Sequence, residues 1–269
     1  MFGLGRWRRA RILKRYGIPI AQFDAACARL PVLYGLDASE RARLREQATL
    51  FIHDKTFSAA GGAEVDDAVQ LAVALQACLL TLNLDDTSYR GWNEIILYPD
   101  EFLRAREEVD EAGVVHRSRD ILAGESWHGG PLVLSIANVI DSGQTDGVNV
   151  VLHEFAHKLD MLNGDANGYP PLHRGMDAAA WARDFGAAYA DFCARVDAGE
   201  DTAIDPYAAT DPAEFFAVLT EVFFETPRLL NAEYPAVYRQ MQQFYRQHPL
   251  ARLAARAPLV SPPACLTGA

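Results

Sequence analysis

The run His153-Glu154-Phe155-Ala156-His157 combines residue types and a spacing that can carry out chemistry. On a helix, two histidines four residues apart lie on one face, one turn apart, so both can reach one metal ion. The glutamate beside the first histidine can then meet a metal-bound water as a general base. We therefore expect His153 and His157 to bind Zn²⁺ and Glu154 to act as the base of a metal-assisted hydrolysis.

The residues around this run predict a largely buried amphipathic helix. Asp146 is the expected N-cap, and Asn163-Gly164 marks the expected C-terminal end. The apolar residues at helical spacing are Val148, Val151, Leu152, Phe155, Ala156 and Leu159. The two histidines could instead be ordinary polar residues of a helix. Because an unpartnered imidazole is costly on a buried helix, metal binding is the better interpretation.

A catalytic zinc site uses a third protein ligand and leaves one position for water. The pattern H-E-x-x-H-x-x-G-x-x-H would place glycine at position 160 and histidine at 163, where this chain has Asp160 and Asn163. A histidine ligand at that spacing is therefore excluded. Asp160 could orient a ligand histidine from behind, or it could be a solvated or capping acid near the helix end.

A second stretch supplies the candidates for the third ligand. Asp211 and Pro212 predict the start of a helix that runs to about Glu225 and is apolar on most sides. Its acids Glu214 and Glu221 lie seven residues apart on one face, and buried acids need a partner cation. Glu214 could instead close a capping box with Asp211, which would leave Glu221 as the ligand. The residues alone favour Glu214 slightly and keep both acids as alternatives.

These residues resemble the Mlc titration factor A (MtfA) family, and the resemblance extends over about residues 30–255. The further matches are Ile95 to Pro99, Gly124 to Trp127 and Gly130 to Leu134. The family comprises zinc metallopeptidases of the gluzincin type, with a catalytic core similar to that of anthrax lethal factor. The resemblance implies that Glu214, in the run Glu-Phe-Phe-Ala, is the third zinc ligand and that Tyr207 stabilises the oxyanion. Under this assignment Glu221 lies behind the ligands. Without the resemblance, Tyr207 could instead be a packed aromatic residue.

The resemblance also implies an activity and a partner. It implies aminopeptidase-like cleavage of small peptide substrates and binding of Mlc, a glucose-responsive transcriptional repressor, with a role in regulating the glucose phosphotransferase system. A competing interpretation is a non-catalytic binding module that sequesters a transcription regulator. A structural zinc site normally has four protein ligands. His173, in a loop rich in proline and glycine, is the one candidate for a fourth, and the intact Glu154 favours chemistry.

The elements that must position these residues predict a mostly helical α+β fold, with a zincin-like metallopeptidase core, a small sheet and an N-terminal helical part. Helices are expected over residues 37–53 and 66–82, and strands over 94–99, 113–116 and 131–136. The last strand, Pro131 to Ile136, is either the sheet edge at which a peptide substrate adds as a strand or a plain core strand.

The chain is expected to contain one large domain. Residues 1–29 are a basic, poorly ordered N-terminal segment, and residues 256–269 are a loose tail. Between them, residues 30–255 form a single metallopeptidase domain, with a helical part at 30–88 and the catalytic core at 89–255.

Composition and charge exclude several classes of protein. The net charge is −11, although the first fifteen residues hold six basic side chains and no acid. An acidic body argues against direct nucleic-acid binding, and the basic tip is expected to be a solvated terminus rather than a membrane anchor. The most apolar segment, Ala68 to Leu84, is broken by polar residues, so no stable membrane insertion is expected. Four scattered cysteines favour a reducing cytoplasm over a disulfide framework.

Overall fold

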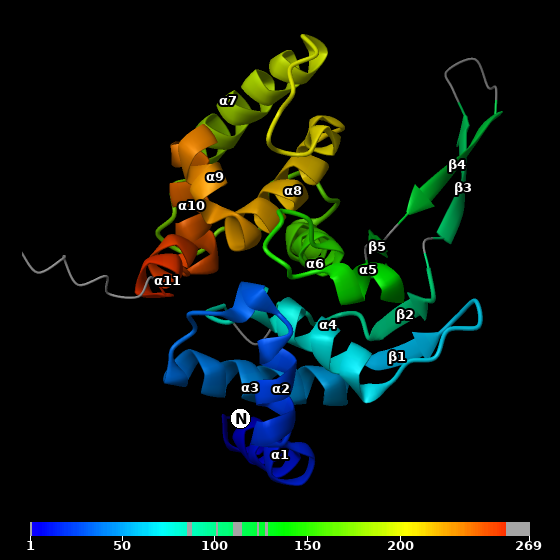
Figure 1. Ribbon diagram of the computed structural model, residues 1–269, viewed down its shortest axis with the longest axis vertical. Helices are drawn as coiled ribbons and strands as arrows, with labels where there is room; N and C mark the ends of the chain where they lie inside the picture. The colour runs from blue at the N-terminus through cyan, green and yellow to red at the C-terminus, as the bar shows by residue number, and fades with distance from the viewer. Residues whose placement is uncertain are drawn as a thin grey trace, which may run out of the picture.

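The computed structural model describes residues 2–84, 88–100, 102–109, 115–122, 124–126 and 129–256 (Figure 1). The α-helices of these ranges are α1 (Phe2–Tyr16), α2 (Ile20–Ala28), α3 (Ala38–Asp54), α4 (Asp67–Leu80), α5 (Ile136–Asp141), α6 (Val150–Asp160), α7 (Ala178–Asp197), α8 (Pro212–Glu225), α9 (Pro227–Glu233), α10 (Pro235–Tyr245) and α11 (Pro249–Arg256). Short 3₁₀ turns are η1 (Pro31–Leu33), η2 (Met161–Asn163) and η3 (Pro206–Ala209). The strands are β1 (Thr56–Ala59), β2 (Glu94–Tyr98), β3 (Phe102–Val109), β4 (Val115–Leu122), β5 (Gly124–Ser126) and β6 (Leu132–Ser135). The expected mostly helical α+β fold is confirmed.

The sheet has the order β1-β2-β6-β5, in which β5 alone runs antiparallel to its neighbour. Strand β6 therefore lies between β2 and β5, with Ile96 opposite Val133 on one side and Ser126 opposite Leu132 on the other. The sequence left Pro131 to Ile136 open as an edge or a core strand, and the structure shows a buried core strand because β5 pairs with its outer side. The edge on this side is β5. Strands β3 and β4 form a separate antiparallel hairpin that extends away from the body in Figure 1.

Helix α6 carries the histidine motif and lies between helix α8 and the sheet, in the middle of the molecule (Figure 1). Its N-cap is Asn149, whose side chain accepts a hydrogen bond from Leu152 N at 2.9 Å. The expected cap at Asp146 is wrong, because that side chain instead accepts from Val148 N in the loop before the helix. The helix ends at Asp160 and continues as η2 to Asn163, close to the expected end.

An aromatic cluster fixes the buried side of α6. The ring of Phe155 lies 5.7 Å from Phe51 of α3, 5.0 Å from Tyr89 and 5.9 Å from Trp92. Phe155 is completely buried, and aromatic pairs at these separations add to the free energy gained by burial alone. The apolar half of the motif therefore anchors the helix, which leaves its polar half facing α8.

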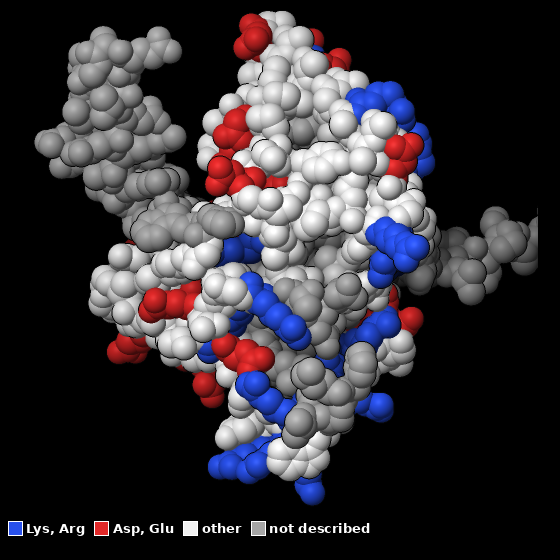
Figure 2. Space-filling view, turned by 180° about the vertical axis from the view of Figure 1, so that it is seen from behind, with Lys and Arg blue, Asp and Glu red and all other residues white. Residues whose placement is uncertain are grey.

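The N-terminal residues differ from the expectation. Residues 2–28 form helices α1 and α2 rather than a poorly ordered segment. Helix α1 packs on α3 through the buried Ile12. Two of its arginines form ion pairs with acids of α3: Arg8 lies 3.6 Å from Asp54, and Arg9 lies 3.3 Å from Glu46. Figure 2 shows lysine and arginine gathered over this lower part of the molecule. Of the expected loose tail at 256–269, only Arg256 lies within the described residues.

Among the described helices, none combines the length and the apolar character needed to cross a membrane.

Candidate metal centre

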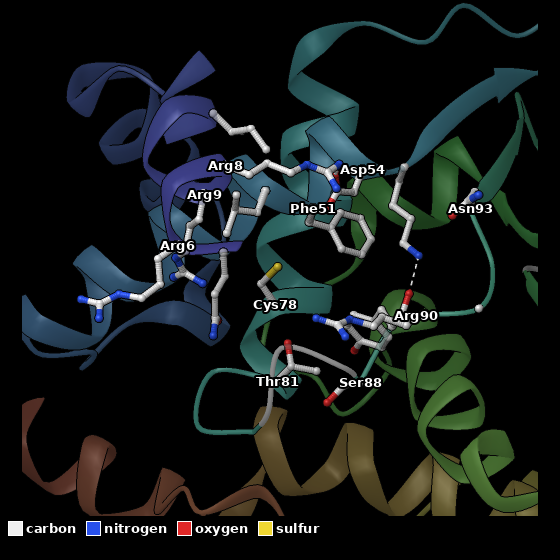
Figure 3. A pocket seen from close by; sticks show the side chains of 16 residues that line it. Arg6, Arg8, Arg9, Phe51, Asp54, Cys78, Thr81, Ser88, Arg90 and Asn93 are labelled. Atoms are coloured by element: carbon white, nitrogen blue, oxygen red, sulfur yellow. Dashed lines mark hydrogen bonds and ion pairs between the residues drawn. The ribbon is translucent and has the colours of Figure 1, made fainter. Parts of the chain in front are cut away.

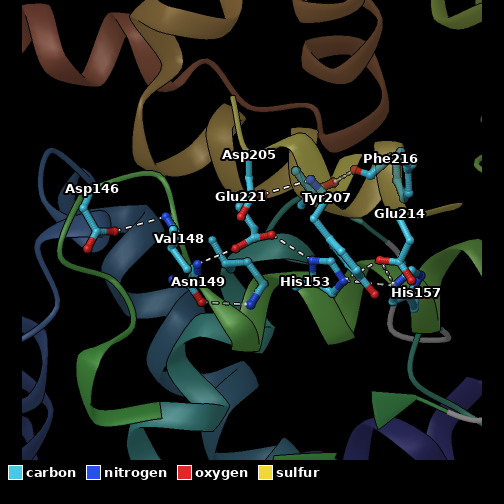
Figure 4. A network of polar contacts seen from close by, with 12 residues as sticks. Asp146, Val148, Asn149, His153, His157, Asp205, Tyr207, Glu214, Phe216 and Glu221 are labelled. Carbon is cyan, nitrogen blue, oxygen red and sulfur yellow. Dashed lines mark hydrogen bonds and ion pairs between the residues drawn. The ribbon is translucent and has the colours of Figure 1, made fainter. Parts of the chain in front are cut away.

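Three potential metal ligands converge where α6 faces α8 (Figure 4). His153 Nε2 lies 3.2 Å from His157 Nε2 and 2.9 Å from Glu214 Oε2, and His157 Nε2 lies 3.3 Å from the same carboxylate oxygen. Bonds of about 2.0–2.1 Å at tetrahedral angles place zinc ligands roughly 3.3 Å apart. The three atoms therefore already have the mutual spacing that a tetrahedral ion needs, and the donor set of two imidazoles and one carboxylate suits zinc.

The start of α8 brings Glu214 to this point. Asp211 caps the helix by accepting hydrogen bonds from the backbone N–H groups of Ala213 and Glu214, and Pro212 occupies the first turn. The Glu214 side chain contacts both histidines, so it is directed to them and not to a capping box. The structure thus separates the two alternatives that the sequence kept for Glu214.

Glu221 contacts the opposite nitrogen of the same imidazole. Its Oε1 lies 2.8 Å from His153 Nδ1, so the ring is held between Glu214 at Nε2 and Glu221 at Nδ1. A carboxylate behind a ligand histidine fixes the tautomer and the ring orientation, and it makes the other nitrogen a stronger donor to a metal. Glu221 therefore contacts His153 on the side away from the three converging atoms.

The side chain of Glu154 packs against a glycine of the edge strand. Glu154 is 5% exposed, and a Cβ added at Gly124 of β5 would lie 2.5 Å from Glu154 Cγ and 2.7 Å from Oε1. Both distances are far below an ordinary van der Waals contact of 3.4–4 Å. A residue larger than glycine at this place in β5 would therefore displace the carboxylate. The need for glycine here was missed at the sequence level, where Gly124 gives only a turn signal.

Tyr207 lies at the open side of the cluster. It belongs to η3, whose start is fixed by Asp205 accepting from Tyr207 N, and its ring centroid is 6.1 Å from that of His153. The residue is 47% exposed, and the charge of Glu214 acts on its hydroxyl. A substrate that reaches the ligands would therefore meet this hydroxyl.

Asp160 lies one turn after His157 and is completely buried. Its Oδ2 accepts hydrogen bonds from the backbone N–H groups of Asn167 and Gly168, each at 2.7 Å. Within the described residues, Asp160 Oδ1 and His157 Nδ1 are both buried and lack a hydrogen-bond partner. Asp160 thus holds the loop after α6, and the structure shows no direct hydrogen bond from it to a histidine.

Burial and charge shift the titration of the cluster. Burial alone would lower the pKa of His153, but its hydrogen bonds with Glu214 and Glu221 raise that pKa well above 6.5. Burial opposes ionisation of Glu214 as well, yet both histidines hold the pKa of that carboxyl well below its usual range. Burial, followed by the charges of Glu214 and Glu154, raises the pKa of Tyr207 above 10. The Tyr207 hydroxyl therefore stays protonated at neutral pH and can donate a hydrogen bond.

A cavity of about 720 Å³ lies elsewhere, between α1, α3, α4 and the segment around residues 88–93 (Figure 3). Arginines from α1 and Arg90 line it, and Lys55 in its wall donates to the backbone carbonyls of Tyr89 and Trp92. None of the three converging ligands borders this cavity. Two of its lining residues, Phe51 and Tyr89, pack on Phe155 of the motif helix.

Comparison with known proteins agrees with this geometry. Residues 4–246 match the family described as glucose-regulated metallo-peptidase M90, so the chain belongs to this family of metallopeptidases. It is 41% identical over 256 residues to Mlc titration factor A of Salmonella agona, an alignment that covers 93% of this chain and 94% of the relative. It is 42% identical over 236 residues to the protein of the same name from Salmonella arizonae, covering 86% of this chain and 92% of the relative. The resemblance to the MtfA family is confirmed.

Proposed function

We propose that the protein is a zinc-dependent peptidase in which His153, His157 and Glu214 hold the metal. The observation that carries this proposal is the spacing of their three ligand atoms, between 2.9 and 3.3 Å, at one point between two helices. The metallopeptidase family to which the chain belongs supports the same assignment. A bound Zn²⁺ would supply Lewis-acid chemistry at this point, lowering the pKa of a water to about 7 and polarising a peptide carbonyl.

The chain's own residues carry the proton transfers. Glu154 takes a proton from the attacking water and returns it to the leaving amine, a role suited to a carboxylate that β5 holds in place. The protonated hydroxyl of Tyr207 donates to the oxyanion that develops on the carbonyl oxygen. One such donor contributes on the order of 3 kcal/mol to the transition state.

Strand β5 is the binding edge we propose for the substrate. It is the terminal strand of the sheet, and Gly124 places it directly against Glu154. An extended peptide that adds to this edge through backbone hydrogen bonds would bring a scissile bond to the general base. The resemblance to the MtfA family further suggests an aminopeptidase-like preference for short substrates, in a cytoplasmic setting consistent with free Cys27, Cys78 and Cys193.

Incubation of the purified protein with chromogenic amino-acyl anilides, with and without a chelator, tests the enzymatic proposal. Release of the chromophore that the chelator abolishes and Zn²⁺ restores is the expected result. No release from protein with one bound zinc would contradict the enzyme and favour a binding module that sequesters a regulator.

A repressor partner is a separate proposal, supported by the name of the relatives. Mlc titration factor A of Salmonella agona is named for Mlc, and we extend this to an Mlc-like repressor as a partner of the present chain. Calorimetric titration of such a repressor, purified from the same host, into the protein would show saturable binding. A flat titration at micromolar concentrations would contradict this partner and leave the peptidase proposal unaffected.

A further inference from the structure

A chain of buried polar groups lies behind Glu221 and joins three helices to the preceding loop. Asn149 Nδ2 donates to Glu225 Oε1 and to Gln76 Oε1, each at 2.7 Å. The backbone N–H of Asn149 donates to Glu221 Oε2, and the backbone N–H of Thr145 donates to Glu225 Oε2. Asn149, Gln76 and Glu225 are at most 3% exposed, so these groups have exchanged water for one another. Figure 4 shows the part of this chain that runs from Asn149 through Glu221 to His153.

Asn149 uses every polar group that it has. Its Oδ1 caps α6 at Leu152 N, its carbonyl oxygen accepts from His153 N, and its three N–H bonds point to Glu225, Gln76 and Glu221. Serine or aspartate would cap the helix as well. Only asparagine combines this cap with two side-chain donors, so capping alone does not account for the residue.

The identity of Glu225 is likewise explained by the hydrogen-bond partners around its side chain. Each of its two carboxylate oxygens faces a donor, Asn149 Nδ2 at Oε1 and Thr145 N at Oε2. A glutamine side chain has an acceptor oxygen at one position and an NH₂ group at the other, so either orientation of its amide would set an N–H against another N–H. Burial raises the pKa of Glu225 to about 7, with the charges of Asp146 and Glu221 adding to the shift and the two hydrogen bonds opposing it. At pH 8 the carboxylate is therefore mostly ionised, which is the state that accepts both bonds.

This chain of buried polar groups ends on His153, a candidate metal ligand. Asn149 holds one oxygen of Glu221, whose other oxygen lies 2.8 Å from His153 Nδ1. We propose that Asn149 and Glu225 are positioning residues that act through Glu221 to hold His153 in the orientation in which its Nε2 faces the metal. This inference rests on the proposed function, because Asn149 and Glu225 can position a ligand only if the three converging residues bind a metal.

Exchanging the polarities of the two residues tests the inference. Glu225→Gln sets a donor against the Asn149 amide or the Thr145 N–H, and Asn149→Asp sets an acceptor against Glu225 and against Gln76. Both keep the side-chain size, and the aspartate keeps the helix cap. The double variant restores the match, because the introduced glutamine can donate to the introduced aspartate and accept from Thr145 N. The amide of Gln76 can turn its Nε2 toward the same aspartate. A role in ligand positioning predicts that metal affinity is lost in the single variants and recovered in the double variant.

The dissociation constant of Zn²⁺, measured at pH 8 by competition with a chromogenic chelator, is the main readout, and the Co²⁺ absorption spectrum reports the ligand geometry. We expect roughly tenfold weaker Zn²⁺ binding and an altered Co²⁺ spectrum in each single variant, as for other supports behind metal ligands. The double variant is expected to return to within about threefold of the parent, as coupled neighbours do. Single variants that bind Zn²⁺ like the parent, or a double variant whose losses add, would overturn the inference.

Thr220→Val is the matched control on the same helix. Thr220 is completely buried and hydrogen-bonds with Phe216 O and Tyr245, away from the chain described above. It is expected to lose stability in urea and to keep parental Zn²⁺ affinity. The outcomes also separate the two proposals: a parent protein that binds no Zn²⁺ refutes the metal centre itself, whereas a parent that binds Zn²⁺ with unaffected variants refutes the positioning role alone.

Discussion

Substitution of Gly124 by alanine probes the contact that holds the proposed general base. The added methyl group would lie 2.5, 2.7 and 2.9 Å from Cγ, Oε1 and Cδ of Glu154. An ordinary contact begins at 3.4 Å, so the two groups must separate by about 1 Å. The backbone of Gly124 is not in the left-handed region, and alanine adds no strain of its own there.

The size of the effect of Gly124→Ala depends on whether Glu154 or strand β5 moves. If Glu154 moves, a displacement of about 1 Å of a catalytic group lowers kcat on the order of 100-fold. If strand β5 moves instead, overpacking costs about 1–3 kcal/mol of stability, and the edge proposed for the substrate is displaced from the base. In both cases His153, His157 and Glu214 remain in place, so Zn²⁺ binding is expected to be unchanged.

Steady-state hydrolysis of an amino-acyl anilide, together with zinc content and urea denaturation, measures these effects. Gly186→Ala is the control, because Gly186 lies inside α7 and a Cβ there meets nothing within 4 Å. That variant is expected to keep full activity and to gain about 0.5–1 kcal/mol, since alanine favours the helix. Parental kcat and parental stability in Gly124→Ala would refute the placement of Glu154 against β5.

Further predictions address the other residues of the centre. Tyr207→Phe removes the exposed hydroxyl and is expected to lower kcat by about 10²–10³ with zinc retained; unchanged turnover would leave Tyr207 as a packed aromatic residue. Asp160→Ala leaves the N–H groups of Asn167 and Gly168 without their acceptor, which should cost about 2–4 kcal/mol in urea denaturation, and a loss below about 0.5 kcal/mol would contradict this role. The two carboxylates at His153 raise its pKa above 6.5, so the folded metal-free protein holds a proton that the unfolded chain releases. Its stability should therefore fall as pH rises from about 6.5 through that raised pKa, and equal pH slopes with and without zinc would argue against this coupling.

The sequence predicted that His153 and His157 lie together on one face of α6, as the structure shows, because one turn of helix sets their spacing. Their separation of four residues places His153 and His157 on one face of a helix. The apolar residues around them predict which face is buried. The choice between Glu214 and Glu221 could not be made in this way. Both lie on the same face of α8, and both contact His153, at opposite nitrogens of its ring. Which acid joins the ligands depends on how α8 is placed against α6, and no local pattern contains that information.

The features that the sequence analysis missed also depend on contacts between distant segments. Gly124 matters because β5 lies against Glu154, thirty residues later in the chain, and Asn149 matters because Glu221 and Glu225 arrive from α8. The sequence could not decide whether Pro131 to Ile136 is an edge or a core strand, because the short strand β5 that pairs with β6 gives little sequence signal. The helix cap at Asn149 had a local signal, since it stands three residues before Leu152, but Asp146 offered a competing one.

Turnover and zinc content of Glu154→Gln, measured on the same preparation, test the central claim most directly. Glutamine keeps the shape of the buried side chain and removes its basicity, while the three ligands stay untouched. We expect one Zn²⁺ per chain, bound as in the parent, and loss of at least about 100-fold in kcat on an anilide that the parent cleaves. Bound Zn²⁺ with full activity would contradict the assignment of Glu154 as the base.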